Sequence, residues 1–130
     1  MNIERFTEKS QEAIRAAQRL AQKFGQQETD IEHLLLALLD QESGLAGAVL
    51  VKSGAAVDAV KIRLQRELEK LPRVSGGSQS EDRFYAGGRL RRLLDKAEDE
   101  AKKWKDDFIS ADVLLLLIAR ADGPAAKVLG

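Results

Sequence analysis

The chain has 130 residues, enough for one domain with a single core, and its 21 Lys and Arg residues balance its 21 Asp and Glu residues. A net charge of zero lacks the field that draws proteins to nucleic acid or anionic lipid, so neither is expected as a main partner. The absence of Cys excludes disulfides and thiolate metal sites, and without a signal peptide or an apolar run near ~20 residues we expect a cytoplasmic protein outside the membrane.

The first expected element is an amphipathic helix. Apolar residues recur at spacings of three and four from Phe6 to Phe24, and Gly25 ends the pattern. The Thr-Asp-Ile-Glu segment at 29–32 has the form of a capping box and leads into a second helix over 31–39. Because residues 34–39 of this second helix are apolar on every side, we expect it at the centre of the fold.

Two further helices and a linker follow in the first half. A short helix is predicted over 45–53, ended by Gly54, and an amphipathic helix over 57–71 is stopped by Pro72. Residues 73–83 are rich in Gly, Ser and charged residues, which bury too little surface to offset their ordering entropy. This segment is predicted to be a mobile loop.

The second half repeats this order. A helical stripe runs from Leu90 to Trp104, Ser110 can cap an apolar helix over 113–118, and Gly123-Pro124 opens a last short helix. A shift of 80 residues overlays the two halves, as the following matches show: Ala17 on Ala97, Ala21 on Ala101, Lys23 on Lys103, Phe24 on Trp104 and Leu34-Leu35-Leu36 on Leu114-Leu115-Leu116.

The duplication predicts an all-α fold of two pseudo-symmetric four-helix repeats in one domain, 1–130. Repeat one covers about 6–71, the linker loop 73–83 and repeat two about 84–130. The two leucine-rich helices are expected to pack together as a shared core. The second copy stops before a counterpart of the last helix of repeat one, so we expect the sequence to be a truncated piece of a longer protein.

Few residues carry catalytic or ligand-binding signals. His33 is the only His and is interpreted as a partly buried residue at a helix start, with a metal ligand as the alternative. Gly87-Gly88 lacks the lysine and the spacing of a phosphate-binding loop. No catalytic residue, metal or cofactor is therefore expected in the domain, and we predict that it is not an enzyme and, alone, is a monomer that does not hydrolyse ATP.

Two charged segments leave alternatives open. Residues 83–92 mix aromatic side chains with arginines, which is typical either of a solvated helix start or of a small nucleic-acid binder. Asp106 and Asp107 precede the second apolar helix. The positive end of the helix dipole favours negatively charged side chains at this place, so simple capping is one interpretation. The alternative interpretation is that these two residues and Asp112 form the rim of an apolar groove, which selects extended hydrophobic peptides.

Several segments together resemble a known family. The opening Arg5-Phe6-Thr7, the helix at 31–39, the Leu-Pro-Arg-Val segment at 71–74 and the Asp-Asp-Phe-Ile-Ser segment at 106–110 are similar to the double Clp N-terminal repeat. Within that family the last two segments, and the loop that follows residue 74, look more like the ClpB protein disaggregases than the protease-partner unfoldases ClpA and ClpC or the type VI secretion ATPase.

The resemblance implies an eight-helix, non-catalytic, substrate-recognition domain that binds exposed apolar segments of unfolded or aggregated polypeptides. The implied parent is a hexameric AAA+ ATPase that uses ATP and Mg and cooperates with a DnaK-type chaperone system. The implied alternative is an adaptor- or substrate-docking domain of a ClpA- or ClpC-type unfoldase. The substrate groove carries over onto Thr7, Leu94, Asp106, Asp112 and Val113, and we add Leu90, which lies one helical turn before Leu94. Asp112 stands where the family usually has Glu.

Overall fold

The computed structural model describes residues 5–26, 28–41, 45–52, 54, 56–70, 87–103 and 108–120. This part of the chain forms six helices, which are α1 (Glu8–Lys23), α2 (Ile31–Asp40), α3 (Leu45–Lys52), α4 (Val57–Glu69), α5 (Gly88–Lys103) and α6 (Ala111–Arg120). The all-α prediction is confirmed. The linker 73–83, Trp104, Asp106, Asp107 and the last short helix predicted after Gly123 lie outside the described residues.

The ends of α1 are defined by local chemistry. Thr7 is the N-cap, and its hydroxyl oxygen accepts a hydrogen bond from the Ser10 backbone N–H at 3.2 Å. At the other end Gly25 has a φ of 69°, a left-handed conformation that glycine adopts without a Cβ clash. The apolar face between these ends is buried, as the sequence pattern predicts, through Ala13, Ile14, Ala17 and Ala21.

Replacing Thr7 by Ala is expected to destabilise the domain by about 1 kcal/mol, because one backbone N–H of the first turn loses its partner. The hydroxyl also donates to Ser10 Oγ at 3.0 Å, so the substitution removes two contacts of Thr7. Urea unfolding measures the free energy of unfolding of the original protein and of the Thr7→Ala variant. Thr7→Ser is the control, since it retains the hydroxyl, and an equal loss in both variants would contradict the capping role.

The second helix begins one residue later than the predicted capping box implies. Asp30, not Thr29, is the N-cap, and its side chain accepts from the Ile31 N–H at 2.7 Å. His33 occupies the third helical position, and its Nδ1 accepts from the Asp30 backbone N–H at 2.9 Å. The box therefore uses Asp and His where the sequence pattern pointed to Thr and Glu. His33 is fully buried rather than partly buried.

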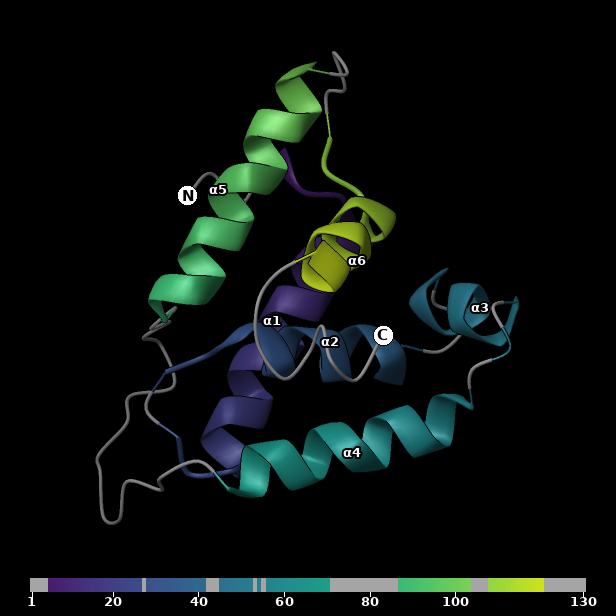
Figure 1. Cartoon of the computed structure of the whole chain (residues 1–130). Helices are drawn as coiled ribbons and strands as arrows, with labels where there is room; N and C mark the ends of the chain where they lie inside the picture. The colour runs from purple at the N-terminus through teal and green to yellow at the C-terminus, as the bar shows by residue number, and fades with distance from the viewer. Residues whose placement is uncertain are drawn as a thin grey trace.

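The two repeats share one core. Helices α2 and α6 contact each other and lie at the centre of Figure 1, with α4 and α5 on opposite sides of them. This arrangement confirms the expected packing of the two leucine-rich helices. Helix α1 packs along α2, α4 packs along α2 as well, and α5 packs along α6. The buried side chains of α4 are Val60, Leu64 and Leu68, at the spacing of a helical stripe.

A short parallel bridge joins the start of the first repeat to the second. Ile109 N–H donates to the Arg5 carbonyl at 2.7 Å, and Thr7 N–H donates to the Ile109 carbonyl at 3.0 Å. Ser10 Oγ donates to the same Ile109 carbonyl at 3.0 Å. Phe6 and Ile109 are 1% and 0% exposed, so the bridge also places both apolar side chains in the core.

Candidate functional site

The residues predicted to form the substrate groove lie at different depths. Thr7 is half-buried beside the bridge, and Val113 is half-buried on α6 against the core. Leu90 and Leu94 are each 1% exposed and belong to the core itself. Asp106 lies outside the described residues, and Asp112 is described only as part of the backbone of α6. A peptide on this surface would meet the neighbours of the two leucines rather than the leucines themselves.

One apolar side chain at this end of α6 does face solvent. Phe108 is 60% exposed, although the adjacent Ile109 is fully buried. The bridge holds the Ile109 backbone against Arg5 and Thr7, and this fixes Phe108 close to the α1 N-cap. The sequence reasoning did not select Phe108. In an extended segment successive side chains point to opposite faces, but a segment of two residues is too short for this alternation to be recognised in the sequence.

A polar cluster joins α2 to α5. Arg89 Nη1 lies 3.4 Å from Asp30 Oδ2 and 3.2 Å from Glu32 Oε1, and the Gly87 N–H donates to the Thr29 carbonyl at 2.9 Å. Glu32 is 3% exposed, whereas the Arg89 side chain is 34% exposed, so the carboxylate of the pair is buried and the guanidinium reaches the surface. Breaking such a pair leaves a buried charge, which makes the cluster a structural tie between the repeats.

A buried hydrogen-bonded chain joins α2 to α4. Because His33 Nδ1 accepts from Asp30, the neutral ring carries its proton on Nε2, which faces Gln26 Oε1. Gln26 Nε2 in turn donates to the Leu68 carbonyl near the end of α4. Burial lowers the pKa of His33 to about 4, and the carboxylate of Asp30 opposes this shift only in part. His33 therefore remains neutral at neutral pH.

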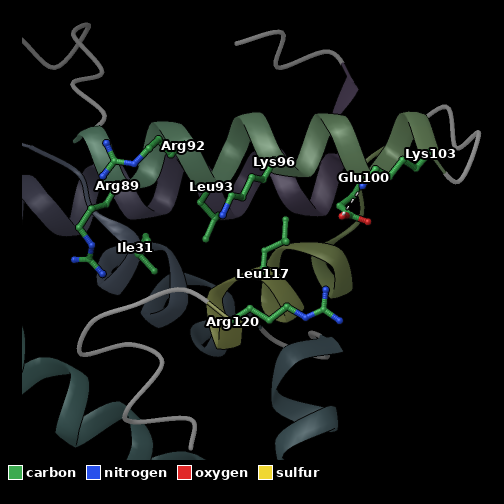
Figure 2. A pocket seen from close by; sticks show the side chains of 9 residues that line it. All are labelled: Ile31, Arg89, Arg92, Leu93, Lys96, Glu100, Lys103, Leu117 and Arg120. Carbon is green, nitrogen blue, oxygen red and sulfur yellow. Dashed lines mark ion pairs between the residues drawn. The ribbon is translucent and has the colours of Figure 1, made fainter.

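A groove of about 530 Å³ runs between α5 and α6, within the size range of binding sites. Figure 2 shows Leu93 and Lys96 directed from α5 toward α6, and Leu117 directed from α6 toward α5. Ile31 contributes from the start of α2. The charged residues that line the groove are Arg89, Arg92, Lys96, Lys103 and Arg120, with Glu100 as the single carboxylate among the described lining residues.

The described residues contain no group of three or more His, Asp or Glu side chains placed to hold a metal ion. None of the helices in the described ranges is long and apolar enough to cross a membrane.

Comparison with known proteins decides the family. The model of the Clp repeat N-terminal domain matches residues 5–130, which is nearly the whole chain. The chain belongs to the Clp repeat N-terminal domain family. Among curated relatives of this Clp domain, the chaperone protein ClpB of Nitratidesulfovibrio vulgaris is 39% identical over 130 residues, and that of Bacillus anthracis is 35% identical over 128 residues. The match covers 100% and 98% of the chain, and the chain spans about 15% of the length of each relative.

Solved structures with the same fold include other Clp N-terminal domains. The N-terminal domain of the caseinolytic protease associated chaperone ClpD from Arabidopsis thaliana gives a TM-score of 0.74 at 22% identity, covering 99% of this chain and 85% of that one. The N-terminal domain of the ClpV1 ATPase from an E. coli type VI secretion system gives a TM-score of 0.81 at 23% identity. That match covers 98% of this chain and 77% of the ClpV1 domain. The two-repeat Clp fold is therefore shown.

Proposed function

We propose that this domain recognises exposed apolar segments of unfolded or aggregated polypeptides for a ClpB-type disaggregase, without catalysing a reaction itself. The observation that carries the proposal is Phe108, an aromatic side chain that is 60% exposed at the residues predicted to bind substrate. Aromatic side chains dominate the energetics of protein interfaces, because each can bury a large apolar area. The resemblance of the 106–110 segment to the ClpB type and the 35–39% identity to ClpB chaperones support the disaggregase over the ClpA- or ClpC-type alternative.

In the longer protein, the domain would pass its clients to AAA+ ATPase modules of the same chain. Those modules would supply ATP and Mg binding and hexamer formation, and the whole would work with a DnaK-type system in the cytoplasm. Binding by the domain is expected to be weak, because one aromatic anchor contributes only about 1.5–3 kcal/mol. Weak binding suits a recruiting domain, since a client must be released to the motor.

The proposal is tested by titrating the labelled domain with a permanently unfolded polypeptide, such as a reduced and alkylated globular protein, and following amide shifts. Shifts are expected around Thr7, Phe108 and Val113. Phe108→Asp should weaken binding about tenfold or more while helix content is unchanged, because the side chain is exposed in the free domain.

Ile62→Asp is the matched control. Ile62 is also a large apolar residue, 49% exposed, but it lies on α4. This variant is expected to bind like the original protein. If both substitutions weaken binding equally, or if the shifts cluster on α4, apolar recognition at Phe108 is wrong.

A further inference from the structure

The contact between the start of one repeat and the segment before the central helix of the other repeat is made twice. In the first junction the Thr7 N–H donates to the Ile109 carbonyl at 3.0 Å, and in the second junction the Gly87 N–H donates to the Thr29 carbonyl at 2.9 Å. Gly87 lies 80 residues after Thr7, and Ile109 lies 80 residues after Thr29. The two junctions share this backbone hydrogen bond, so their side chains can be compared position by position.

The first junction has a buried hydroxyl that the second lacks. Ser10 on α1 is 0% exposed, and the residue 80 positions later is Leu90, which is 1% exposed. Ser10 Oγ donates to the Ile109 carbonyl at 3.0 Å and accepts from the Thr7 hydroxyl at 3.0 Å. Burying a hydroxyl costs free energy unless it is hydrogen-bonded, and leucine fills the equivalent place without that cost. Ser10 therefore does something at the first junction that leucine does not do at the second.

Ser10 completes the hydrogen bonding of one carbonyl. A carbonyl oxygen has two lone pairs, and that of Ile109 accepts from both the Thr7 N–H and the Ser10 hydroxyl. The Ile109 N–H donates in turn to the Arg5 carbonyl at 2.7 Å. The peptide groups before and after Ile109 are thus both held against the segment that leads into α1.

The residue before Ile109 is Phe108. Successive side chains of an extended segment point to opposite sides, so a buried Ile109 directs Phe108 outward. In the second junction the equivalent position is occupied by Glu28, which is exposed. A carboxylate in water needs no fixed orientation, whereas an apolar side chain that binds a partner gains affinity when it is held in place before binding. The buried hydroxyl thus occurs in the junction that presents an aromatic side chain.

We infer that Ser10 is a positioning residue of the client site, because its hydroxyl holds Ile109 so that Phe108 is presented in one orientation beside the N-cap of α1. Ser10 cannot touch a client itself, since it is fully buried. It acts through the Ile109 carbonyl. The inference rests on the proposed function, in which Phe108 contacts the client, but the effect of Ser10 on Phe108 is measurable without a client.

Ser10→Ala tests this role, because it removes the hydroxyl and places a good helix former in α1. The matched control is Val60→Ala on α4, which truncates a buried side chain that is not part of the bridge. Urea unfolding measures how much free energy of unfolding each substitution costs. Both variants are then compared with the original protein for the order parameter of the Phe108 amide, from amide nitrogen relaxation, and for affinity to the reduced and alkylated globular protein.

Ser10→Ala is expected to lower the order parameter of the Phe108 amide from about 0.85, typical of rigid backbone, toward about 0.6. Client affinity should fall about fivefold, the equivalent of one typical hydrogen bond, because a mobile Phe108 has to be ordered on binding. Val60→Ala should leave both quantities unchanged, even where it costs as much stability as Ser10→Ala.

Three outcomes would overturn the inference. Ser10→Ala could leave the order parameter of Phe108 unchanged, which would make Ser10 an ordinary core residue. Ser10→Ala and Val60→Ala could lower the order parameter equally, which would assign the effect to general destabilisation. The order parameter could fall without any loss of affinity although Phe108→Asp weakens binding, which would show that the orientation of Phe108 does not matter to the client.

Failure of the proposed function is a separate result. If Phe108→Asp binds the client as well as the original protein does, Phe108 is not the contact site. The order parameter of Phe108 in the Ser10→Ala variant still decides whether Ser10 positions this side chain, because it is measured on the free domain.

Discussion

Leu36→Ala should destabilise the domain by about 3 kcal/mol, whereas Leu116→Ala should cost about 0.5 kcal/mol. Leu36 is 1% exposed, so its truncation removes buried methyl groups and leaves a cavity between packed helices. Leu116 is 50% exposed, and surface substitutions away from special contacts change stability little. Urea unfolding followed by circular dichroism at 222 nm measures both.

The two variants control for each other, because the same substitution is made at equivalent positions of two repeats. Helix propensity changes equally in both variants. The difference of about 2.5 kcal/mol between their losses of unfolding free energy therefore reflects how deeply each leucine is buried by neighbouring residues. Equal losses would show that the two faces are packed alike in solution.

Lowering the pH from 7 to 4 should destabilise the original protein by about 3 kcal/mol more than a His33→Gln variant. In the unfolded chain His33 takes up a proton as the pH falls through its ordinary pKa of 6.5, but in the folded domain burial delays protonation to about pH 4. Protons therefore favour the unfolded state in this window. The contribution to stability is complete above pH 6.5 and is lost progressively toward pH 4.

The structure gives the molecular reason for this pH dependence. A second proton on His33 would occupy Nδ1, which accepts the Asp30 backbone N–H, so protonation breaks the cap of α2. Urea titrations at pH 7, 5.5 and 4 on both proteins yield the difference, in which the common titration of surface carboxylates cancels. A difference that stays constant with pH would show that His33 is protonated as easily in the folded domain as in the unfolded chain.

The helices were predictable because their core faces repeat over several turns. Helices α1, α4 and α5 have apolar residues at helical spacing over several turns, and α2 and α6 have continuous runs of leucine. Both patterns are strong signals of helices that bury apolar surface. Gly25 and Gly54 were correctly placed as helix ends, and both have positive φ. The duplication itself predicted that α2 and α6 would pack together, since neither buries its leucines alone.

The candidate site was less predictable. Periodicity shows that residues share one face of a helix, but it does not show whether that face contacts the core or the solvent. Leu90 and Leu94 lie on one stripe as expected, yet the stripe faces the core instead of solvent. Phe108 is a single residue in a non-helical segment and has no period to reveal it. The capping box of α2 was shifted because Asp30 and Thr29 are both good N-caps, and only the buried ring of His33 decides between them.

The bridge between residues 5–7 and 109 sets a limit on when the domain can fold during its synthesis. Ser10 hydrogen-bonds a carbonyl 99 residues further along the chain. At a translation rate of 5–20 residues per second, about 5–20 s separate the appearance of these two partners. During that time Phe6, Thr7 and Ser10 lack their partner Ile109, although α1 can already pack against α2. A nascent chain shorter than about 110 residues is therefore expected to lack the bridge and to expose Phe6 to chaperones.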